Sequence, residues 1–317
     1  MDTRAHDPFA TDVRRGLESA PKRLDPRYFY DALGSHLFEA ICQLPWYPLT
    51  RAETSLLERH GAQMVAGLGE GATLVELGCG CGEKLALLAA PLGERVGRVR
   101  VDLVDVSATA LELSTRTLAR LPGLEVTARR ATYEEGLAAA AAERPRAGAL
   151  LVLFLGSNLG NLDPPASAAF LRRLRDALRP GDALLLGTDL IKPAEDLLLA
   201  YDDPLGVTAA FNKNLLVRIN RELGADFDLR AFDHRARWNA QASRVEMHLV
   251  SRRPQRVRVP AAGLDVAFAE GESIWTESSY KYDPEQLDRM AAEAGFRCTE
   301  RWTDPRARFA TSLLVAS

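Results

Sequence analysis

The stretch that decides the fold is Val75-Glu-Leu-Gly-Cys-Gly-Cys-Gly-Glu-Lys84. It overlaps the end of a run typical of a buried strand, Ala72 to Leu77, and a helix is expected to begin near Glu83. Glycine at every second position lets the backbone turn sharply and approach a ligand, because no Cβ atom stands in the way. A second expected strand, Val99 to Val104, ends in Asp105. A carboxylate at that position can accept hydrogen bonds from both ribose hydroxyls of a nucleotide-type ligand.

The glycine spacing differs from the dinucleotide-binding pattern. Gly78, Gly80 and Gly82, preceded by the acid Glu76, resemble the first motif of S-adenosylmethionine-dependent methyltransferases. The alternative is a tight strand-to-helix turn that binds nothing, and Asp105 weighs against it. S-adenosyl-L-methionine is therefore the expected cofactor.

Composition excludes several classes of protein. The 317 residues are 47% apolar and 26% charged, which is ordinary for a globular protein with an ample core. A net charge of −3 and the absence of a long basic stripe argue against binding to nucleic acid. No apolar run reaches the ~18 residues that a membrane span needs, and Met1 to Leu24 has no apolar centre typical of a signal peptide. We therefore expect a cytoplasmic protein that contacts neither nucleic acid nor membrane.

The four cysteines are too few and too scattered for a disulfide scaffold. Cys79 and Cys81 lie inside the glycine loop, but zinc would need further ligands and none of the five histidines supplies a metal-binding pattern. No metal is expected.

Strands and helices alternate from Thr73 onward. Strands are expected at 73–77, 99–104, 124–129, 149–154 and 183–187, and helices at 83–91, 107–120, 134–142 and 165–178. Continuously apolar strands such as Leu150–Leu155 indicate a parallel sheet covered on both faces. The predicted fold is α/β: a doubly wound, class I (Rossmann-like) methyltransferase sheet whose ligand lies beyond the carboxyl ends of the strands.

A second lobe of α+β type is expected from the remaining segments. Asp31 to Leu44 carries a helical apolar stripe, and Thr50 with Glu53 suggests a capping box for the next helix. After Asp189 the pattern predicts helices at 192–205 and 208–223 and strands at 231–236, 243–251 and 255–259, and 266–282 is expected to return toward a final sheet. A terminal strand is expected at 309–315. The expected domains are 1–52 plus 192–281, which would bind the substrate, and 53–191 plus 282–317, which would bind S-adenosylmethionine. The cleft between lobes is the expected substrate site.

Taken in order, many segments resemble the histidine Nα-methyltransferases of ergothioneine biosynthesis, the family that forms hercynine. The segments are Arg27–Asp31, Gly34-Ser35, Leu44-Pro45, Thr50–Glu53, Val75–Lys84, Phe154–Ser157, Gly160–Leu162, Leu186–Leu190, Tyr201–Pro204, Val207-Thr208, Phe211-Asn212, Ala236–Asn239, Arg244–Met247, Thr276-Glu277, Ser279 and Lys281. They cover nearly the whole chain. The resemblance implies Nα-trimethylation of L-histidine.

The resemblance also implies residue roles for the cofactor. Gly78, Lys84 and Asp105 match positions that contact it, with Asp105 on the ribose. Thr132 and Tyr133 match positions beside the adenine, where the family more usually has an aspartate before the aromatic residue. The Thr132 hydroxyl can still accept from the adenine amino group, but without charge.

For the substrate, the resemblance implies residues that contact the α-amino and carboxylate groups, residues that contact the imidazole, and a residue that lines the same lobe. The matching residues are Asn161, Tyr47 and Tyr201 for the amino acid groups, Tyr30 near the amine, Met247, Glu277 and Ser279 for the imidazole, and Thr208 in the lobe. Asn161 would orient the amine lone pair, and Tyr30 would accommodate the growing methylammonium by cation–π contact. No histidine base is nominated, since a free α-amino group has a minor neutral fraction near neutral pH. If their segment is a strand, Glu277 and Ser279 project to one face and can satisfy both imidazole nitrogens.

Other readings stay open at this point. The tyrosines can be packing residues, Asn161 a capping or turn residue, Lys84 a solvated side chain, Met247 an ordinary core residue, and Glu277 with Ser279 a polar strand surface. The substrate can be a tryptophan-derived amine, although a buried carboxylate opposes an apolar indole. The chain can also be an inactive cofactor-binding scaffold. A monomer is expected, because no long apolar surface helix demands a partner.

Overall fold

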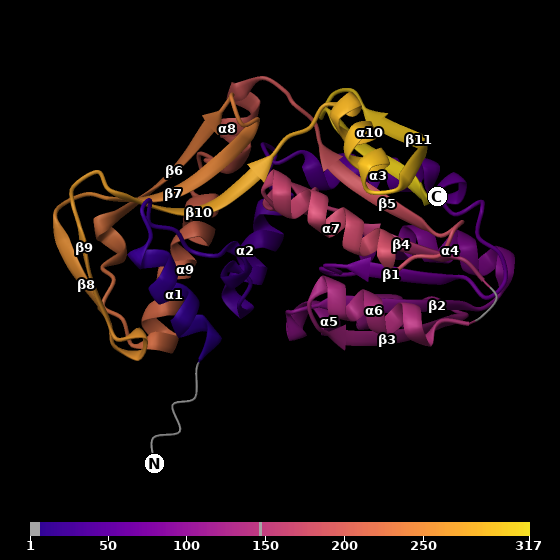
Figure 1. Ribbon diagram of the computed structural model, residues 1–317, viewed down its shortest axis with the longest axis horizontal. Coiled ribbons are helices and arrows are strands. Elements are labelled where there is room, and N and C mark those ends of the chain that lie inside the picture. The colour runs from indigo at the N-terminus through magenta and orange to yellow at the C-terminus, as the bar shows by residue number, and fades with distance from the viewer. Residues whose placement is uncertain (1–6, 146–147) are drawn as a thin grey trace, which may run out of the picture. The chain divides into compact units, whose positions relative to one another are not determined.

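The computed structural model describes residues 7–145 and 148–317 and divides the chain into two compact units (Figure 1). Unit 1 comprises the chain up to Tyr47 together with Lys192–Ser279, and unit 2 comprises Pro48–Ile191 and Tyr280–Ser317. The expected boundaries after residues 52 and 281 differ from these. Residues 49–52 open a helix that packs on the sheet of unit 2, and residues 280–281 also lie with unit 2.

Unit 2 is built on a seven-stranded sheet in the order β11-β12-β5-β4-β1-β2-β3. Its strands are β1 (Thr73–Leu77), β2 (Val99–Asp105), β3 (Leu124–Arg130), β4 (Leu150–Phe154), β5 (Ala183–Asp189), β11 (Phe296–Asp304) and β12 (Phe309–Ala316). The first five are mutually parallel, whereas β12 runs antiparallel to both β5 and β11. The five predicted parallel strands and the terminal strand are confirmed. β11 was not predicted.

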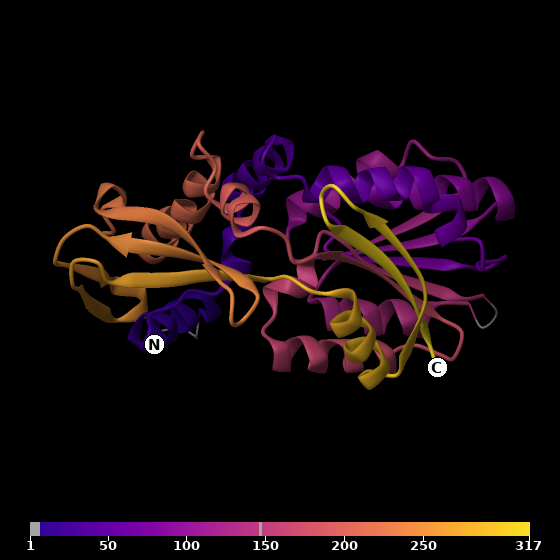
Figure 2. The same cartoon turned by 90° about the horizontal axis from the view of Figure 1, so that it is seen from above.

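Helices cover both faces of this sheet, as Figure 2 shows. One layer holds α3 (Leu49–Met64), α4 (Glu83–Val96) and α5 (Ala108–Leu118), and the other holds α6 (Tyr133–Glu143), α7 (Pro164–Asp176) and α10 (Pro284–Glu293). All five residues of β1 and of β4 are buried, because apolar helices press on them from both sides. The predicted doubly wound α/β class is confirmed.

Local sequence explains where most helices begin. α7 starts after Asp163, whose side chain accepts the Ala166 N–H at 2.9 Å. The capping box expected at Thr50 and Glu53 is wrong. α3 begins at Leu49 without a side-chain cap, and Glu53 is buried because it pairs with a lysine of α4.

Unit 1 combines helices with two small antiparallel sheets. Its helices are α1 (Pro8–Glu18), α2 (Ala32–Gln43), α8 (Ala194–Tyr201) and α9 (Val207–Leu223), with a 3-10 turn η1 (Pro26–Phe29). Strands β6 (Phe232–Asn239), β7 (Arg244–Ser251) and β10 (Ser273–Tyr280) form one sheet in the order β10-β7-β6, and β8 (Gln255–Val259) pairs with β9 (Leu264–Phe268). The helices and strands predicted between 208 and 259 are confirmed, and the helix expected at 192–205 is shorter. α1 was not predicted.

The expected return of residues 266–282 toward a final sheet ends in the small sheets of unit 1. β9 pairs with β8, and β10 joins β7 in the small sheet. The physical reason is the burial of β10, whose first residues alternate between half-buried and buried. Such alternation suits an antiparallel sheet covered on one face better than a parallel strand covered on both.

A buried charge inside unit 2 yields a stability prediction. The Asp102 side chain on β2 is fully buried and accepts from Arg100 Nε at 2.9 Å and Arg129 Nε at 2.6 Å. Asp102→Ala removes one carboxylate partner from each of two guanidinium groups and leaves both with Glu143, so we expect the free energy of unfolding to fall by about 3 kcal/mol in urea denaturation. Glu112→Ala, which breaks an exposed pair with Arg116, is the control and should change it by under about 1 kcal/mol. Equal effects of the two changes would contradict the prediction.

Candidate active site

The glycine loop lies at the carboxyl end of β1. Gly82 has φ +78° and caps α4, and a Cβ atom there would lie 2.9 Å from the Ser114 Cα, so this end of the loop is fixed by packing. Gly80 has φ +53°, and a Cβ atom there would meet no heavy atom within 4 Å. The loop is therefore packed at Gly82, where the helix begins, and open at Gly80. The open space at Gly80 allows a ligand to approach the backbone.

Asp105 lies beside this loop. β2 is the parallel neighbour of β1, so its last residue is brought to the same edge of the sheet. Asp105 Oδ1 accepts the Ser107 N–H at 2.8 Å, and Oδ2 lies 4.0 Å from the Cys79 Sγ. Burial raises the pKa of this carboxyl, while backbone N–H groups including those of Gly80 and Cys79 act in the opposite direction. The structure thus brings together the loop and the acid that the sequence predicted.

Glu76 supplies an unsatisfied acceptor at the start of the loop. It is buried in β1, and its Oε2 has no hydrogen-bond partner among the described residues. Burial raises its pKa to about 8, and the nearby Lys84 only partly offsets this. A buried oxygen without a donor is costly unless a ligand supplies one. Glu76 therefore fits a ligand that carries a cationic or N–H group.

Lys84 in the first turn of α4 is not simply solvated. Its Nζ lies 2.5 Å from Oε2 of the fully buried Glu53, and Glu53 also accepts the Gly156 N–H at 2.8 Å. The pair thus ties α4 to the loop that follows β4. The sequence analysis missed this role of Glu53. One feature points to it: a carboxylate on the apolar stripe of α3, between Ala52 and Leu56, needs a buried partner.

Tyr133 and Thr132 follow β3. The Tyr133 hydroxyl would lie 3.2 Å from a Cβ atom on Gly78, and its ring packs edge-on against Phe154 at 5.4 Å. Burial, reinforced by the charge of Asp105, raises the Tyr133 pKa. Thr132 is exposed, and its hydroxyl donates to Glu135 Oε2 at 2.9 Å and accepts the Glu135 N–H, forming a capping box for α6. Tyr133 thus joins the loop, whereas the Thr132 hydroxyl is engaged in its own helix.

Asn161 is the last residue of a 3-10 turn, η2 (Asn158–Asn161), that follows β4. It is half-buried. The cap of the next helix, α7, is Asp163 rather than Asn161. The capping role considered from sequence is therefore taken by another residue.

In unit 1 the predicted tyrosines belong to one aromatic cluster. Ring centroids lie 4.6 Å apart for Phe29–Phe211, 5.7 Å for Tyr30–Phe38, 5.8 Å for Tyr30–Phe211, 6.5 Å for Phe38–Tyr47 and 6.2 Å for Tyr47–Tyr201. Phe38 bridges Tyr30 and Tyr47, a role that the sequence analysis missed because it assigned Phe38 to an ordinary helical stripe. Tyr30, Tyr47 and Tyr201 thus belong to one contiguous aromatic cluster.

One polar residue of β10, Ser279, contacts this cluster. Ser279 Oγ and the Tyr201 hydroxyl share a hydrogen bond of 2.7 Å, and both side chains are buried. Burial raises the Tyr47 pKa well above its usual value, and the charges of Tyr201 and Glu277 contribute to the shift. Glu277 is half-buried and precedes Ser279 by two residues on β10. Because Ser279 is buried, the reading of this pair as a polar strand surface is wrong for Ser279.

Met247 and Thr208 are buried in the same unit. Met247 pairs with Ala236 on β6, two residues from His234, whose ring contacts α8 and α9. Because residues two apart share a face, Met247 lies on the side of the sheet that α8 and α9 cover. Thr208 is in the first turn of α9, and its N–H donates to Asp203 Oδ2 at 2.7 Å.

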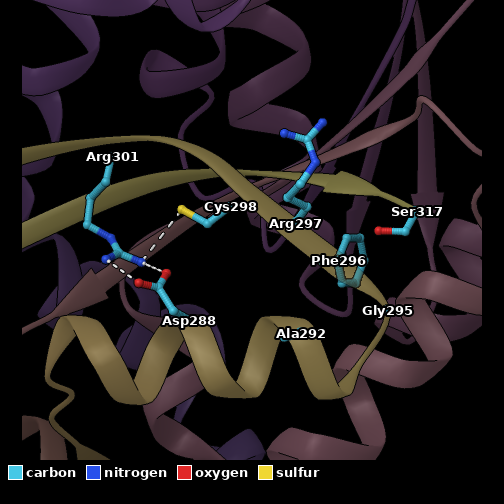
Figure 3. A pocket seen from close by; sticks show the side chains of 8 residues that line it. All are labelled: Asp288, Ala292, Gly295, Phe296, Arg297, Cys298, Arg301 and Ser317. Atoms are coloured by element: carbon cyan, nitrogen blue, oxygen red, sulfur yellow. Dashed lines mark hydrogen bonds and ion pairs between the residues drawn. The ribbon is translucent and has the colours of Figure 1, made fainter.

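A hollow of about 600 Å³ elsewhere in unit 2 is not part of this site (Figure 3). It is lined by Asp288, Ala292, Gly295, Phe296, Arg297, Cys298, Arg301 and Ser317. Phe296 pairs with Ala316, and the neighbouring Val315 pairs with Ala183 at the start of β5. The hollow therefore lies at the amino ends of the parallel strands, opposite the glycine loop.

Two negative findings complete the description. Within residues 7–145 and 148–317, no group of three or more His, Cys, Asp or Glu side chains is arranged to hold a metal ion. In the same part of the chain, no helix has the length and apolar character needed to cross a bilayer.

The strand order, the glycine loop and the acid after β2 define an S-adenosylmethionine-dependent methyltransferase of class I. Comparison with known proteins is more specific. Residues 9–316 match the family described as "Histidine-specific methyltransferase, SAM-dependent", and the chain belongs to this family.

The relatives agree with this assignment. "Histidine N-alpha-methyltransferase" of Mycolicibacterium smegmatis is 47% identical over 312 residues, which cover 98% of this chain and 96% of the relative. The protein of the same name from Mycobacterium tuberculosis is 46% identical, covering 97% and 95%. Among solved structures, a possible exported protein from Bordetella parapertussis has a TM-score of 0.50 at 14% identity over 98% of this chain and 94% of that one, which shows a shared fold alone.

Glu76 leads to a prediction about pH. A carboxyl with a pKa of about 8 is protonated in the free protein near neutral pH, and a positively charged cofactor favours its ionised form. Cofactor binding should therefore release a proton below pH 8, and its association constant should rise up to ~10-fold per unit between pH 6 and 7.5. Calorimetric titration at several pH values measures this rise. Glu76→Gln is the matched control and should flatten the profile, whereas an unchanged slope would exclude Glu76 as its source.

Proposed function

We propose that this protein transfers methyl groups from S-adenosyl-L-methionine to the α-amino nitrogen of L-histidine, three times in succession, to form hercynine in ergothioneine biosynthesis. Family membership and the near-full-length similarity to two histidine N-alpha-methyltransferases support the reaction and the substrate. The observation that carries the proposal is the buried hydrogen bond between Ser279 and Tyr201, whose ring lies 6.2 Å from that of Tyr47. Glu277 lies two residues before Ser279 on the same strand.

The residues of unit 2 would hold the cofactor. Asp105 can accept from the ribose hydroxyls, Glu76 offers its unpaired oxygen to a cationic group, and Gly80 leaves the loop open. Tyr133 would flank the adenine, with Thr132 at the rim. When bound, the cofactor supplies a methyl group on a sulfonium centre, which is already activated for displacement.

The residues of the chain recognise histidine and align its amine with the methyl group. Glu277 accepts from one imidazole N–H, while Ser279, oriented by Tyr201, donates to or accepts from the other nitrogen. The side chains of Met247 and Thr208 fill the surrounding surface, and Tyr47 with Asn161 holds the α-amino and carboxylate groups. Alignment of this kind is worth ~7–11 kcal/mol in a displacement reaction.

Successive methylation makes the amine more bulky and finally gives it a permanent charge. The face of Tyr30, fixed by Phe38 and Phe211, offers cation–π stabilisation of ~0.5–2 kcal/mol to that charge. The reaction ends when nitrogen has no lone pair left. No protein base is needed, because the amine loses its proton to solvent before each transfer.

The test is incubation of the purified chain with S-adenosyl-L-methionine and each common amino acid in turn, followed by mass spectrometry. We expect a gain of three methyl groups on histidine and none on tryptophan. Methylation of another amino acid with histidine unchanged would overturn the proposed substrate, and no transfer to any amine would favour an inactive scaffold.

Three further expectations stay predictions from the sequence. They are a monomeric state, a cytoplasmic location, and activity without nucleic acid or membrane. Size-exclusion chromatography with light scattering tests the first of them.

A further inference from the structure

A second buried ion pair lies at the carboxyl end of β5. Asp189 is the last residue of the strand, and its Oδ2 lies 2.9 Å from Nζ of Lys281, with both side chains fully buried. Replacing a buried pair with apolar residues is often neutral or stabilising, so burial of two charges is weak evidence for a role in stability. The surroundings of this pair indicate a different role.

The backbone at Asp189 reaches the turn that carries Asn161. The Asp189 N–H donates to Ser157 Oγ at 2.9 Å. Ser157 is buried and has φ +60°, a left-handed conformation that is unfavourable for a residue other than glycine. The Ser157 carbonyl in turn accepts the Gly160 N–H at 2.9 Å. Strained residues of this kind persist where the surrounding contacts over-determine them, and they cluster at functional sites.

The segment that carries Lys281 holds the other side of the same turn. A Cβ atom on Gly160 would lie 2.7 Å from the Tyr280 carbonyl oxygen, so the two backbones are in direct contact. The Tyr282 hydroxyl donates to the Leu159 carbonyl at 3.2 Å, and the Tyr282 N–H donates to the Asp189 carbonyl at 3.1 Å. The turn Asn158–Asn161 is therefore held between the end of β5 and residues 280–282. The ion pair between Asp189 and Lys281 links these two segments to each other.

We propose that Asp189 and Lys281 are positioning residues that, through Ser157, fix the turn Asn158–Asn161 and so the direction in which Asn161 presents its side chain to the reacting amine. This inference rests on the proposed function. In this proposal the ion pair acts indirectly, through Asn161. It sets the geometry of that residue, and misplacement of a reacting group by about 1 Å can cost ~100-fold in rate.

The same strand offers a matched control. Asp182, immediately before β5, forms a buried pair with Arg144 at 2.6 Å and accepts the Leu150 N–H at 2.8 Å. It lies at the amino end of the sheet, away from the turn. Asp182→Asn and Asp189→Asn thus remove one charge from comparable buried pairs at opposite ends of one strand.

The experiment measures kcat and KM for histidine, the ratio of mono-, di- and trimethylated products, and the dissociation constant of S-adenosyl-L-methionine. For Asp189→Asn we expect kcat to fall ~10- to 100-fold, partly methylated histidine to accumulate, and the cofactor dissociation constant to stay unchanged. Asp182→Asn should lower the melting temperature and leave kcat unchanged at a temperature where it is folded.

A second variant keeps the test decisive if Asp189→Asn does not fold. Ser157→Ala removes the hydroxyl without changing any charge, and Ser157→Gly in addition relieves the unfavourable φ. We expect both to reduce kcat alike, because both lack the oxygen that accepts from Asp189. Unchanged kcat in the Ser157 variants, or an equal loss in Asp182→Asn, would overturn the positioning role. A wild-type chain that leaves histidine unmethylated would overturn the proposed function with it, whereas an active wild type with unaffected variants overturns this inference alone.

Discussion

Glu277→Ala is expected to lower kcat/KM for histidine ~10- to 150-fold, with the dissociation constant of S-adenosyl-L-methionine unchanged. A hydrogen bond to a charged group contributes ~1.5–3 kcal/mol, and each 1.4 kcal/mol is a factor of ten. The charge of Glu277 contributes to the raised pKa of Tyr47, and in the proposed site its replacement would deprive the imidazole N–H of a charged acceptor. Steady-state kinetics with histidine and calorimetry with the cofactor measure the two quantities separately.

Two matched variants sharpen this test. Glu272→Ala removes a carboxylate just before the same strand, where it pairs with Lys22, and should leave both constants unchanged. Glu277→Gln keeps a neutral acceptor and should recover part of the loss. Equal weakening of histidine and cofactor would remove the assigned role, because it would indicate damage to the fold rather than loss of one contact.

The parallel sheet was predictable because its signals are local. Glycines 78, 80 and 82 mark a turn with positive φ, and the strands around them are continuously apolar. Strand β11 was not predicted because it is an edge strand whose residues are mostly half-buried or exposed. Its sequence therefore contains no apolar run that indicates a strand. The pairing of β10 with β7 was not predicted, because pairing partners depend on residues far away in the chain, which periodicity does not report.

The candidate site likewise contains residues that local motifs predict and residues whose roles depend on tertiary contacts. Residues with a chemical motif, such as Asp105 after a strand, were placed correctly beside the loop. Glu53 was assigned to a helix cap on local spacing, while tertiary packing uses it to pair with Lys84 and the Gly156 N–H. Ser157 is part of the sequence resemblance only as the end of the segment Phe154–Ser157, and no local pattern indicates its role. Its importance arises from a backbone conformation and a hydrogen bond that exist only in the folded chain.

Asp105→Ala is expected to weaken S-adenosyl-L-methionine binding ~100-fold or more. The carboxylate can accept from two ribose hydroxyls, and each hydrogen bond to a charged group contributes ~1.5–3 kcal/mol. In the free protein, burial raises the pKa of Asp105, which shows that the charged form is held at a cost that a pair of donors would relieve. Calorimetric titration with the cofactor measures the dissociation constant directly.

The matched variants separate ribose recognition from support of the loop. Asp105→Asn keeps an oxygen that can accept the Ser107 N–H, so it should preserve the loop while losing the charge, and we expect an intermediate dissociation constant. Glu112→Ala on the exposed face of α5 should have no effect. If Asp105→Asn binds the cofactor as tightly as the wild type, charge is not what the ribose requires. If Asp105→Ala also binds with unchanged affinity, the ribose contact is excluded.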